Sequence, residues 1–353
     1  MTENLKLEIF NKKNLSKQRE LFRESFPETI NTQVETLQHY DWKFDKFPYT
    51  PKSFEYVAYL DDKMVGYYAA IPYIYKIFET EYKVGMVCDV MTSIAARGKG
   101  VFTKLGSFST NLMKESNLAF TTGYPIRKEV IPGHLKVGWE VVFNLPMYIS
   151  FLKFDTFLRN KNLGFLSIVF NAVIKILSLF EKFFIKKDLG FEIKKYLVND
   201  FVELDDFDKF ISKWTIENKI ALKKTKEFFK WRLNAPGSEY TIIALMRGST
   251  IVGCAITRAV IQEKIPTLAI LDYMLLEENL SLSTYLLYNI KKFALEKKIE
   301  FIICMMNPSI FKRYRFIKSI FIKSPYIFKL IIKRLNIDLN KDILYSETNW
   351  HLT

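Results

Sequence analysis

The pattern of apolar and polar residues along the chain predicts strands and helices in alternation. The run Met86–Thr92 is almost entirely apolar, as expected of a buried strand. After it, Phe102, Leu105, Phe108 and Leu112 recur at steps of three and four residues, which predicts a helix with one apolar face. A loop therefore joins a buried strand to an amphipathic helix at this point of the chain.

The loop and the start of the helix read Arg97-Gly98-Lys99-Gly100-Val101-Phe102-Thr103. The first N–H groups of a helix have no carbonyl partner within it, and with the helix dipole they form a binding site for phosphate. Glycine lets a ligand approach the backbone closely, and Arg97 and Lys99 add positive charge. The motifs GxxxxGK[ST] and GxGxxG are absent. A phosphate-bearing cofactor at this turn is the first hypothesis, and an ordinary glycine-rich turn is the alternative.

The second half of the chain repeats the order of elements seen in the first. Asp89 ends one apolar run and lies 36 residues (125 − 89) before Pro125, and Asp272 lies 36 residues (308 − 272) before Pro308. Each interval holds a loop, an amphipathic helix and a further strand, and hairpin strands precede it. The repeat predicts an α/β fold of two similar domains, each a mixed, mostly antiparallel sheet flanked by helices.

We expect a cofactor-binding domain over residues 1–150, a helical connector over 151–195 and a second domain over 196–353. In the second half, Leu280–Thr284 stands where the first half has its glycine loop, and it contains no glycine and no positive charge. The sequence therefore predicts one copy that binds the ligand and one structural copy.

The connector contains the run Leu163–Phe180, which is nearly continuous apolar sequence interrupted by Asn171 and Lys175. Its length is at the short edge for crossing a bilayer. A buried connecting helix is the first expectation. A helix that lies on the membrane surface is the alternative, because several lysines follow between residues 182 and 195.

The 353-residue chain has a formal net charge of +14, and basic chains favour nucleic acid, anionic lipid or anionic small molecules. No zinc-finger, RRM or heptad pattern accompanies the charge, so we expect no nucleic-acid partner. The 3 cysteines lie singly in apolar runs and the 3 histidines lie far apart, which argues against a metal site. The first residues lack a signal-peptide pattern. We expect a cytoplasmic protein, and peripheral contact to the inner membrane surface through residues 163–195 is the alternative to a buried connector.

These features resemble the GNAT superfamily of acyl-CoA N-acyltransferases, and the repeat resembles bacterial tandem-GNAT enzymes associated with sugar or surface-polysaccharide modification. The resemblance rests on the strand that ends in Val90-Met91-Thr92, the loop Arg97–Gly100, the strand Leu118–Tyr124 and the corner Lys136–Trp139. The family motif Q/R-x-x-G-x-G/A is met at Arg97 and Gly100. It fails at Phe102, where the family has a small residue.

The resemblance implies acetyl-CoA or another acyl-CoA as donor, and no metal. It implies that backbone N–H groups from Arg97 to Thr103 hold the diphosphate, and that the edge Val90, Met91 and Thr92 pairs with the pantetheine arm like an added strand. The cofactor-binding residues are then Val90, Met91, Thr92, Arg97, Gly98, Lys99, Gly100, Val101, Phe102 and Thr103. A backbone N–H near Val90 or Met91 would stabilise the oxyanion formed when an amine attacks the thioester.

The same resemblance implies candidates for proton transfer. His134 stands four residues before the corner glycine, where the family commonly has a tyrosine, and is a candidate acid for the CoA sulfur. Tyr124 is a second candidate, and Glu129 and Glu55 are weaker candidates for the base. For His134 and Tyr124, packing without a chemical role is the alternative.

The expected function is therefore transfer of an acyl group from CoA to an amine, with an amino sugar or nucleotide-linked sugar as the acceptor. One alternative is an enzyme that acylates peptide or protein amines. Another is an aminoacyl-tRNA-dependent peptidoglycan transferase with a similar double fold. A non-enzymatic alternative is a membrane-surface adaptor whose CoA loop is vestigial.

Overall fold

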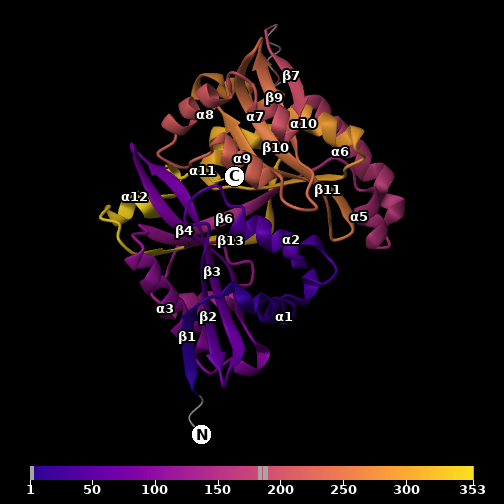
Figure 1. Ribbon diagram of the computed structural model, residues 1–353. Coiled ribbons are helices and arrows are strands. Elements are labelled where there is room, and N and C mark those ends of the chain that lie inside the picture. Colours follow the sequence, from indigo (N-terminus) through magenta and orange to yellow (C-terminus); the bar gives the residue numbers. More distant parts are fainter. Residues whose placement is uncertain (1–3, 182–184, 186–189, 353) are drawn as a thin grey trace. The chain divides into compact units, whose positions relative to one another are not determined.

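The computed structural model describes residues 4–181, 185 and 190–352 of the chain (Figure 1). The chain folds into two compact units. Unit 1 contains the residues up to 143 together with 235–237 and 329–345, and unit 2 contains 144–234, 238–328 and the residues from 346 onward. The mixed α/β fold predicted from the sequence is confirmed.

Unit 1 is a mixed sheet with strand order β1-β2-β3-β4-β5-β13. Its neighbouring strands run antiparallel, except that β4 and β5 are parallel. Its strands are β1 (Leu5–Ile9), β2 (Phe54–Leu60), β3 (Lys63–Ile77), β4 (Thr80–Thr92), β5 (Phe120–Gly123) and the last part of β13 (Ile322–Arg334). Its helices are α1 (Leu15–Ser25), α2 (Leu37–Tyr40), α3 (Val101–Glu115), α4 (Ile131–Lys136) and α12 (Lys341–Tyr345).

Unit 2 has the strand order β6-β12-β11-β10-β9-β7, with β11 and β12 parallel. Its strands are the main part of β6 (Glu140–Phe151), β7 (Glu192–Tyr196), β8 (Ile220–Leu222), β9 (Thr241–Arg247), β10 (Thr250–Gln262), β11 (Ile265–Leu275) and β12 (Phe301–Met305). Its helices are α5 (Asp155–Asn160), α6 (Ser167–Glu181), α7 (Val198–Val202), α8 (Phe207–Ile216), α9 (Lys226–Leu233), α10 (Ser283–Glu296) and α11 (Pro308–Arg313).

Each unit includes a strand from the other half of the sequence. In unit 1, β13 pairs with β5, with Ile331 opposite Gly123. In unit 2, β6 pairs with β12, with Phe151 opposite Phe301. The domain boundaries at residues 150 and 195 that the sequence suggests stay a prediction. The two compact units do not follow these boundaries strictly, because each contains the last strand of the other half of the chain.

Tight turns set the register of the long hairpins. Asp61 and Asp62 join β2 to β3 with φ of +46° and +60°, and Glu263 and Lys264 join β10 to β11 with φ of +49° and +66°. Two successive residues with positive φ form a turn whose twist matches that of paired strands. The hairpins in turn present the apolar faces that the helices cover.

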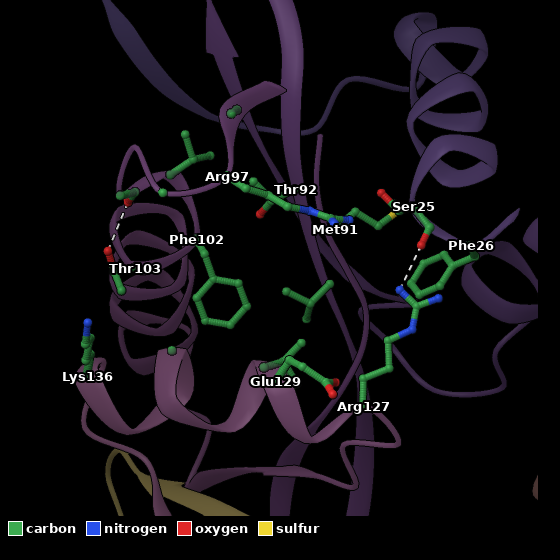
Figure 2. Close-up of a pocket in the computed structure, with 17 residues that line it drawn as sticks. Ser25, Phe26, Met91, Thr92, Arg97, Phe102, Thr103, Arg127, Glu129 and Lys136 are labelled. Carbon is green, nitrogen blue, oxygen red and sulfur yellow. Dashed lines mark hydrogen bonds between the residues drawn. The ribbon is translucent and has the colours of Figure 1, made fainter. Parts of the chain in front are cut away.

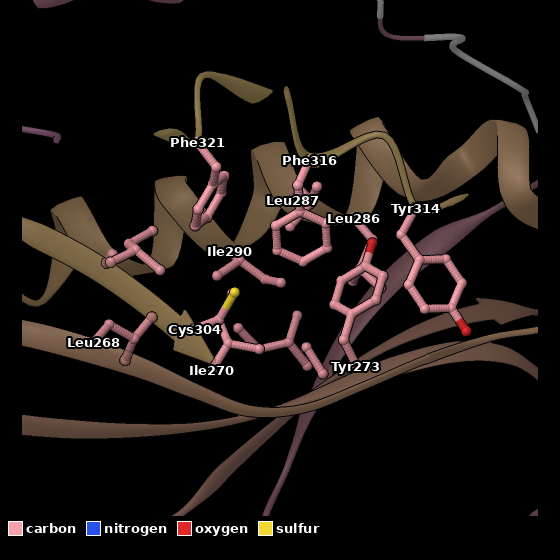
Figure 3. Packing of buried hydrophobic residues seen from close by; sticks show 14 of the residues in the cluster. Leu268, Ile270, Tyr273, Leu286, Leu287, Ile290, Cys304, Tyr314, Phe316 and Phe321 are labelled. Carbon is pink, nitrogen blue, oxygen red and sulfur yellow. The ribbon is translucent and has the colours of Figure 1, made fainter. Parts of the chain in front are cut away.

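Helix α3 lies on the sheet of unit 1 at a point where the sheet has a glycine. A Cβ built on Gly66 of β3 would lie 3.1 Å from side-chain atoms of both Val101 and Leu105. The absence of a side chain at Gly66 therefore lets the first turns of α3 approach β3 closely. In unit 2, α10 takes the corresponding place, and Figure 3 shows Leu286, Leu287 and Ile290 facing the buried residues of the sheet.

The expectation of a buried connecting helix is wrong. The helical stretch Gly164–Glu181 is long and apolar enough to cross a membrane by length and composition, yet only 6% of it is buried. Most of its apolar side chains are exposed, because the residues that face the protein are mainly polar.

Candidate active site

Strand β4 has an open edge where it separates from β5. The two strands pair only over Val84–Met86 and Phe120–Thr122, whereas β4 continues to Thr92. Among the described residues, no other strand pairs with β4 on this side after Met86. Unpaired strand edges offer N–H and C=O groups to an extended ligand. The residues Val90, Met91 and Thr92, predicted to contact the pantetheine arm, lie on this part of β4.

A bulge interrupts β4 at Asp89 and Val90, at the start of this segment. Tyr67 pairs with Met91 and Ala69 pairs with Cys88, so β4 contains one residue more than β3 between the two pairs. Within the bulge Asp89 has a φ of +48°. Because of the extra residue, one peptide group of β4 has no partner in the hydrogen-bond ladder with β3. This peptide group is turned away from β3. This is the region in which the resemblance implies an N–H for the oxyanion.

An ion pair holds the bulge. The Lys43 ammonium lies 2.8 Å from the Asp89 carboxylate, and both side chains are largely buried. Burial opposes the charge on Lys43, but the charge and hydrogen bond of Asp89, together with the nearby Cys88, raise the pKa of Lys43 overall. The recurrence of an aspartate at both bulges (Asp89 and Asp272) is thus linked to an ion pair rather than to proton transfer.

The glycine loop leads from β4 into α3. Gly98 and Gly100 both have a φ of +78°, a conformation that residues with a side chain rarely adopt. A Cβ on Gly98 would meet nothing within 4 Å, so conformation rather than crowding calls for glycine there. Helix α3 begins with the N–H of Lys104 bonding the carbonyl of Gly100 at 3.0 Å.

The start of α3 is open to a ligand. Gly100 is the N-cap, and within the described chain no side chain makes a capping bond there. The N–H groups of Val101, Phe102 and Thr103 precede the first intrahelical bond and therefore have no partner inside the helix. Their dipoles and N–H groups suit a diphosphate.

A cavity of about 620 Å³ in unit 1 connects the loop with the edge of β4. Figure 2 shows Thr103 and Lys136 on one side of it and Ser25 with Arg127 on the other. The cavity brings together the predicted cofactor-binding residues except Lys99, and the predicted base Glu129. These lining residues are Val90, Met91, Thr92, Arg97, Gly98, Gly100, Val101, Phe102, Thr103 and Glu129.

Two residues of the cavity wall, Arg127 and Lys136, were not among the predicted site residues. Arg127 donates to the carbonyl of Ser25 at 2.9 Å and to the carboxylate of Glu28 at 2.6 Å (Figure 2 draws the first bond). Its guanidinium also lies over the ring of Phe26, 5.1 Å from the centroid. Arg127 thus fixes the end of α1 as one wall, a role that rests on long-range contacts and leaves no periodic signal. Lys136 belongs to the corner motif, and that motif could have marked it as a lining residue.

Phe102, the departure from the family motif, turns its ring toward α4. A Cβ on Gly133 would lie 2.6 Å from the Phe102 ring, so the ring packs directly on the glycine backbone. The ring centroids of Phe102 and His134 are 5.0 Å apart. The large side chain therefore fills space between α3 and α4 and forms part of the cavity wall.

His134 lies behind this wall. It is 5% exposed and packs edge-on against Phe102 and Trp139, and it does not line the cavity. Its Nδ1 has no hydrogen-bond partner among the described residues. Burial lowers the pKa of His134 to about 4, so the imidazole is neutral at pH 7. Its role as acid stays a prediction, and this environment favours packing.

The other candidates for proton transfer lie in different surroundings. Tyr124 follows β5 and does not line the cavity; burial raises its pKa, and its hydroxyl hydrogen-bonds to Tyr75. Glu129 is exposed and lines the cavity. Glu55 is buried and accepts hydrogen bonds from the hydroxyls of Tyr40, Tyr67 and Ser53. Glu129 is therefore the carboxylate among these candidates that can reach a substrate in the cavity.

Unit 2 has the same bulge and the same separation of strands. Leu271 is the extra residue of β11, Asp272 beside it pairs with Lys224, and the parallel pairing of β11 with β12 ends at Ile270. The start of α10 is nevertheless filled: Ser283 is fully buried and its hydroxyl donates to the carbonyl of Tyr314 at 2.5 Å. The two helix starts therefore differ, and ligand binding by only one copy stays a prediction.

The cysteines and acidic residues suggest no further chemistry. Cys88, Cys254 and Cys304 are free, and burial raises the pKa of each thiol. No group of three or more His, Cys, Asp or Glu side chains that could hold a metal occurs among the described residues.

An open strand edge at a bulge, followed by an uncapped helix start with positive-φ glycines, is the arrangement that the resemblance to acyl-CoA N-acyltransferases leads us to expect. Residues 8–142 match the family model described as acetyltransferase (GNAT) domain, so this part of the chain is a GNAT domain. A comparison with curated proteins finds no match.

Solved structures with similar folds share little sequence with this chain. A probable N-acyltransferase from Enterococcus faecalis V583 has a TM-score of 0.65 at 10% identity, and the match covers 95% of this chain and 73% of the Enterococcus chain. A GCN5-related N-acetyltransferase from Anabaena variabilis has a TM-score of 0.62 at 11% identity, covering 94% and 73%. Saccharomyces cerevisiae N-myristoyltransferase with bound myristoyl-CoA has a TM-score of 0.62 at 12% identity, covering 100% and 86%.

Proposed function

We propose that this N-acyltransferase moves an acetyl or other acyl group from CoA to the amine of an anionic amino sugar, such as a nucleotide-linked sugar used in surface-polysaccharide synthesis. The observation that carries the proposal is the cavity of about 620 Å³ that joins an uncapped helix start to an open strand edge. The cationic residues Arg97, Arg127 and Lys136 line it, against the single carboxylate of Glu129. A cavity with this balance favours substrates that carry phosphate or carboxylate groups.

The donor fits the cavity in one direction. The diphosphate of CoA binds the N–H groups of Val101, Phe102 and Thr103, and Arg97 adds positive charge. The pantetheine arm then runs along Val90–Thr92 and pairs with the β4 edge. This orientation brings the thioester to the bulge at Asp89. Lys99 is exposed and does not line the cavity.

The reaction needs a neutral amine, an oxyanion site and a proton for the leaving thiolate. The amine lone pair forms a C–N bond to the thioester carbonyl, and the carbonyl oxygen becomes an oxyanion held by an N–H near Val90 or Met91. The C–S bond then breaks, the thiolate takes a proton, and the nitrogen loses one. We propose Glu129, directly or through water, as the group that takes the proton from the nitrogen. The predicted acids His134 and Tyr124 would have to act on the thiolate from behind the cavity wall.

The alternative functions fit the cavity less well. Peptide and protein amines lack the phosphate groups that a basic cavity recognises, and an aminoacyl-tRNA donor would leave the uncapped start of α3 without its diphosphate. A cytoplasmic location is in keeping with a CoA donor. The adaptor alternative requires a vestigial CoA loop, whereas the loop is open and lines the cavity.

Calorimetric titration with acetyl-CoA tests the donor site. Gly100→Glu puts a carboxylate at the N-cap of α3, and we expect it to weaken acetyl-CoA binding at least 100-fold through charge repulsion with the diphosphate. Gly248→Glu is a matched control, because Gly248 also has positive φ, +59°, but lies in a hairpin turn outside the cavity lining. If Gly100→Glu and Gly248→Glu bound acetyl-CoA with equal affinity, the glycine loop would not be part of the donor site.

A panel of amines tests the acceptor. Release of free CoA thiol is followed with a nucleotide-linked amino sugar, a neutral amino sugar and an N-terminal peptide amine as acceptors. We expect the nucleotide-linked sugar to give a kcat/KM at least tenfold above the others, falling as ionic strength rises. A peptide amine that exceeds both sugars would replace the proposed acceptor class while leaving the donor site intact.

A further inference from the structure

Helix α6 of unit 2 presents its polar residues to the protein. Ser167, Asn171, Ser178 and Glu181 follow one another at helical steps and share one face with Ile174. All of them are half-buried or buried. A surface helix of a globular protein ordinarily shows the reverse, with its apolar residues turned inward.

Polar contacts hold this inner face to unit 2. The Asn171 side chain accepts a hydrogen bond from the N–H of Phe154 at 2.8 Å and donates one to the Asp155 carboxylate at 2.8 Å. At the other end of the helix, the buried Glu181 carboxylate lies 2.8 Å from the ammonium of Lys291. The polar face of α6 is thus held to unit 2 near both ends of the helix by hydrogen bonds of Asn171 and the ion pair of Glu181.

The outer face of α6 and the turn before it is apolar and exposed. Phe165 is 74% exposed and Ile168 is 78% exposed. The exposed apolar residues are Phe165, Ile168, Val169, Phe170, Val173, Ile176, Leu177, Leu179 and Phe180. Scattered apolar residues on a surface are ordinary, but a contiguous patch of this extent marks a surface that is covered by a partner or by lipid.

The exposed charged residues of the α5–α6 segment are positive, whereas the carboxylates of Asp155 and Glu181 face the protein and interact with Asn171 and Lys291. Between Asp155 and Glu181 the charged residues are Arg159, Lys161 and Lys175, and all three are exposed. Lys153 and Lys292 are also exposed, and both line a cavity of about 470 Å³ beside α6. A surface with an apolar face and a cationic border complements the headgroups of an anionic bilayer.

We infer that α6 lies in the surface of an anionic lipid bilayer, with its apolar face at the acyl-chain boundary and the surrounding lysines at the headgroup phosphates. A transmembrane orientation would strip Asn171 and Glu181 of their partners in unit 2 and would leave the charge of Glu181 without Lys291. A symmetric dimer through this face would place the same cationic border of two copies together. A bilayer is therefore the occupant that satisfies both the apolar face and the charge.

Vesicle flotation of the full chain tests the inference. The vesicles contain 30% phosphatidylglycerol and 70% phosphatidylcholine, or phosphatidylcholine alone. We expect binding to the anionic vesicles and at least tenfold weaker partition to the neutral ones. The triple variant Phe165→Ser, Ile168→Ser, Phe180→Ser removes exposed side chains only, and we expect it to partition to anionic vesicles at least tenfold more weakly.

The matched control removes the same number of exposed apolar side chains from the same unit. Leu197, Ile216 and Ile261 are 67%, 67% and 70% exposed, and none of them lies on α6. The triple variant Leu197→Ser, Ile216→Ser, Ile261→Ser should bind anionic vesicles within twofold of the unaltered chain. Circular dichroism and acetyl-CoA titration confirm that both triple variants keep their fold.

Equal partition of the α6 variant and the unaltered chain, or no partition of the unaltered chain, would overturn the inference. Sedimentation velocity at micromolar concentration identifies the competing occupant. A dimer of the unaltered chain that becomes a monomer in the α6 variant, without vesicle binding by either, would show that a second copy covers this face. None of these outcomes depends on the identity of the acyl acceptor.

Discussion

His134 illustrates that the surroundings of a residue, more than its type, decide its chemistry. Its position before the corner glycine marks it as a candidate acid. The ring lies among Phe102, Trp139 and Tyr68 instead, and burial lowers its pKa to about 4. A neutral imidazole without a bonded Nδ1 is typical of a packed side chain.

Replacement of His134 by Phe tests this at the level of stability. The pKa of the histidine is about 4 in the folded chain and ~6.5 in an unfolded chain, so the unfolded state takes up the proton first as the pH falls. The stability gained by keeping His134 neutral is present above pH 6.5 and is lost as the pH falls from there toward 4. Between pH 7.5 and 5, we expect the unaltered chain to lose about 2 kcal/mol more of its free energy of unfolding than His134→Phe.

Denaturant unfolding at a series of pH values measures the difference, and His351, also buried with a lowered pKa, is present in both proteins and cancels. Parallel pH profiles would mean that His134 is solvated. The same variant decides its chemical role at pH 7.5. We expect kcat to stay within threefold, whereas a loss of 100-fold or more would establish His134 as the acid.

The residues of the donor site could largely be predicted from the sequence because they are contiguous. Arg97 to Thr103 is a single loop and helix start, and its glycines mark the positive φ directly. Arg127 could not be found in this way, since its contacts with Ser25 and Glu28 span about a hundred residues. The proton-transfer candidates depend on burial, which a single sequence does not report.

Helix α3 shows what periodicity can and cannot predict about an element. The helix was expected to turn Phe102, Leu105, Phe108 and Leu112 to the core. Leu105 is buried, and Phe108 and Leu112 are half-buried and pack against the same core, as expected. The buried side also contains Val101, Ser109 and Met113, and Phe102 faces the cavity. The small residue Gly66 beneath the helix lets Val101 and Leu105 approach the sheet closely. Large aromatic residues at the edges of an apolar face thus mislead a pattern based on hydrophobicity alone.

The fit between α3 and β3 gives a prediction at this scale. A Cβ on Gly66 would lie 3.1 Å from atoms of Ala58, Val101 and Leu105, so Gly66→Ala must push the first turn of α3 outward. We expect a loss of about 1–3 kcal/mol in the free energy of unfolding, together with weaker acetyl-CoA binding because the N–H groups move with the helix. Denaturant unfolding and calorimetry measure the two effects.

Gly106→Ala on α3 itself is the matched control. A Cβ there would make ordinary contacts of 3.5–3.7 Å with Val137 and Tyr68, and alanine is the better helix former by ~1 kcal/mol. Gly106→Ala should therefore keep or raise stability and leave acetyl-CoA affinity unchanged. If Gly66→Ala behaved in the same way, close approach at Gly66 would have no part in positioning the site.

On the scale of the whole chain, the sequence predicted two similar folds but not which strand completes each of them. The equal spacings of 36 residues that follow Asp89 (125 − 89) and Asp272 (308 − 272) can be read from short stretches of sequence. The exchange of β6 and β13 between the units depends on pairings that span 150 residues (301 − 151) and 208 residues (331 − 123). Strands of similar composition carry no mark of their partner. Chain order alone suggests that each half is complete in itself, whereas each compact unit includes the last strand of the other half.

The exchange predicts that the acyl-CoA site depends on residues near the C-terminus. Ile331 of β13 is 1% exposed, sits opposite Gly123 of β5 and belongs to the same core cluster as Val101 and Leu105 of α3. Ile331→Ala should cost about 2–5 kcal/mol, which corresponds to roughly 4–20 °C in the unfolding midpoint of a unit of this size. The transition affected should be the one that acetyl-CoA stabilises.

Scanning calorimetry with and without acetyl-CoA distinguishes this arrangement from two self-contained halves. The control is Ile327→Ala on the same strand, where the side chain is 39% exposed and belongs to unit 2; it should leave the CoA-sensitive transition in place. If Ile331→Ala instead lowered only a transition that acetyl-CoA does not shift, β13 would belong to the second half alone. The donor site would then be stabilised entirely by the residues that the GNAT model matches, and the exchange of strands would have no energetic consequence for it.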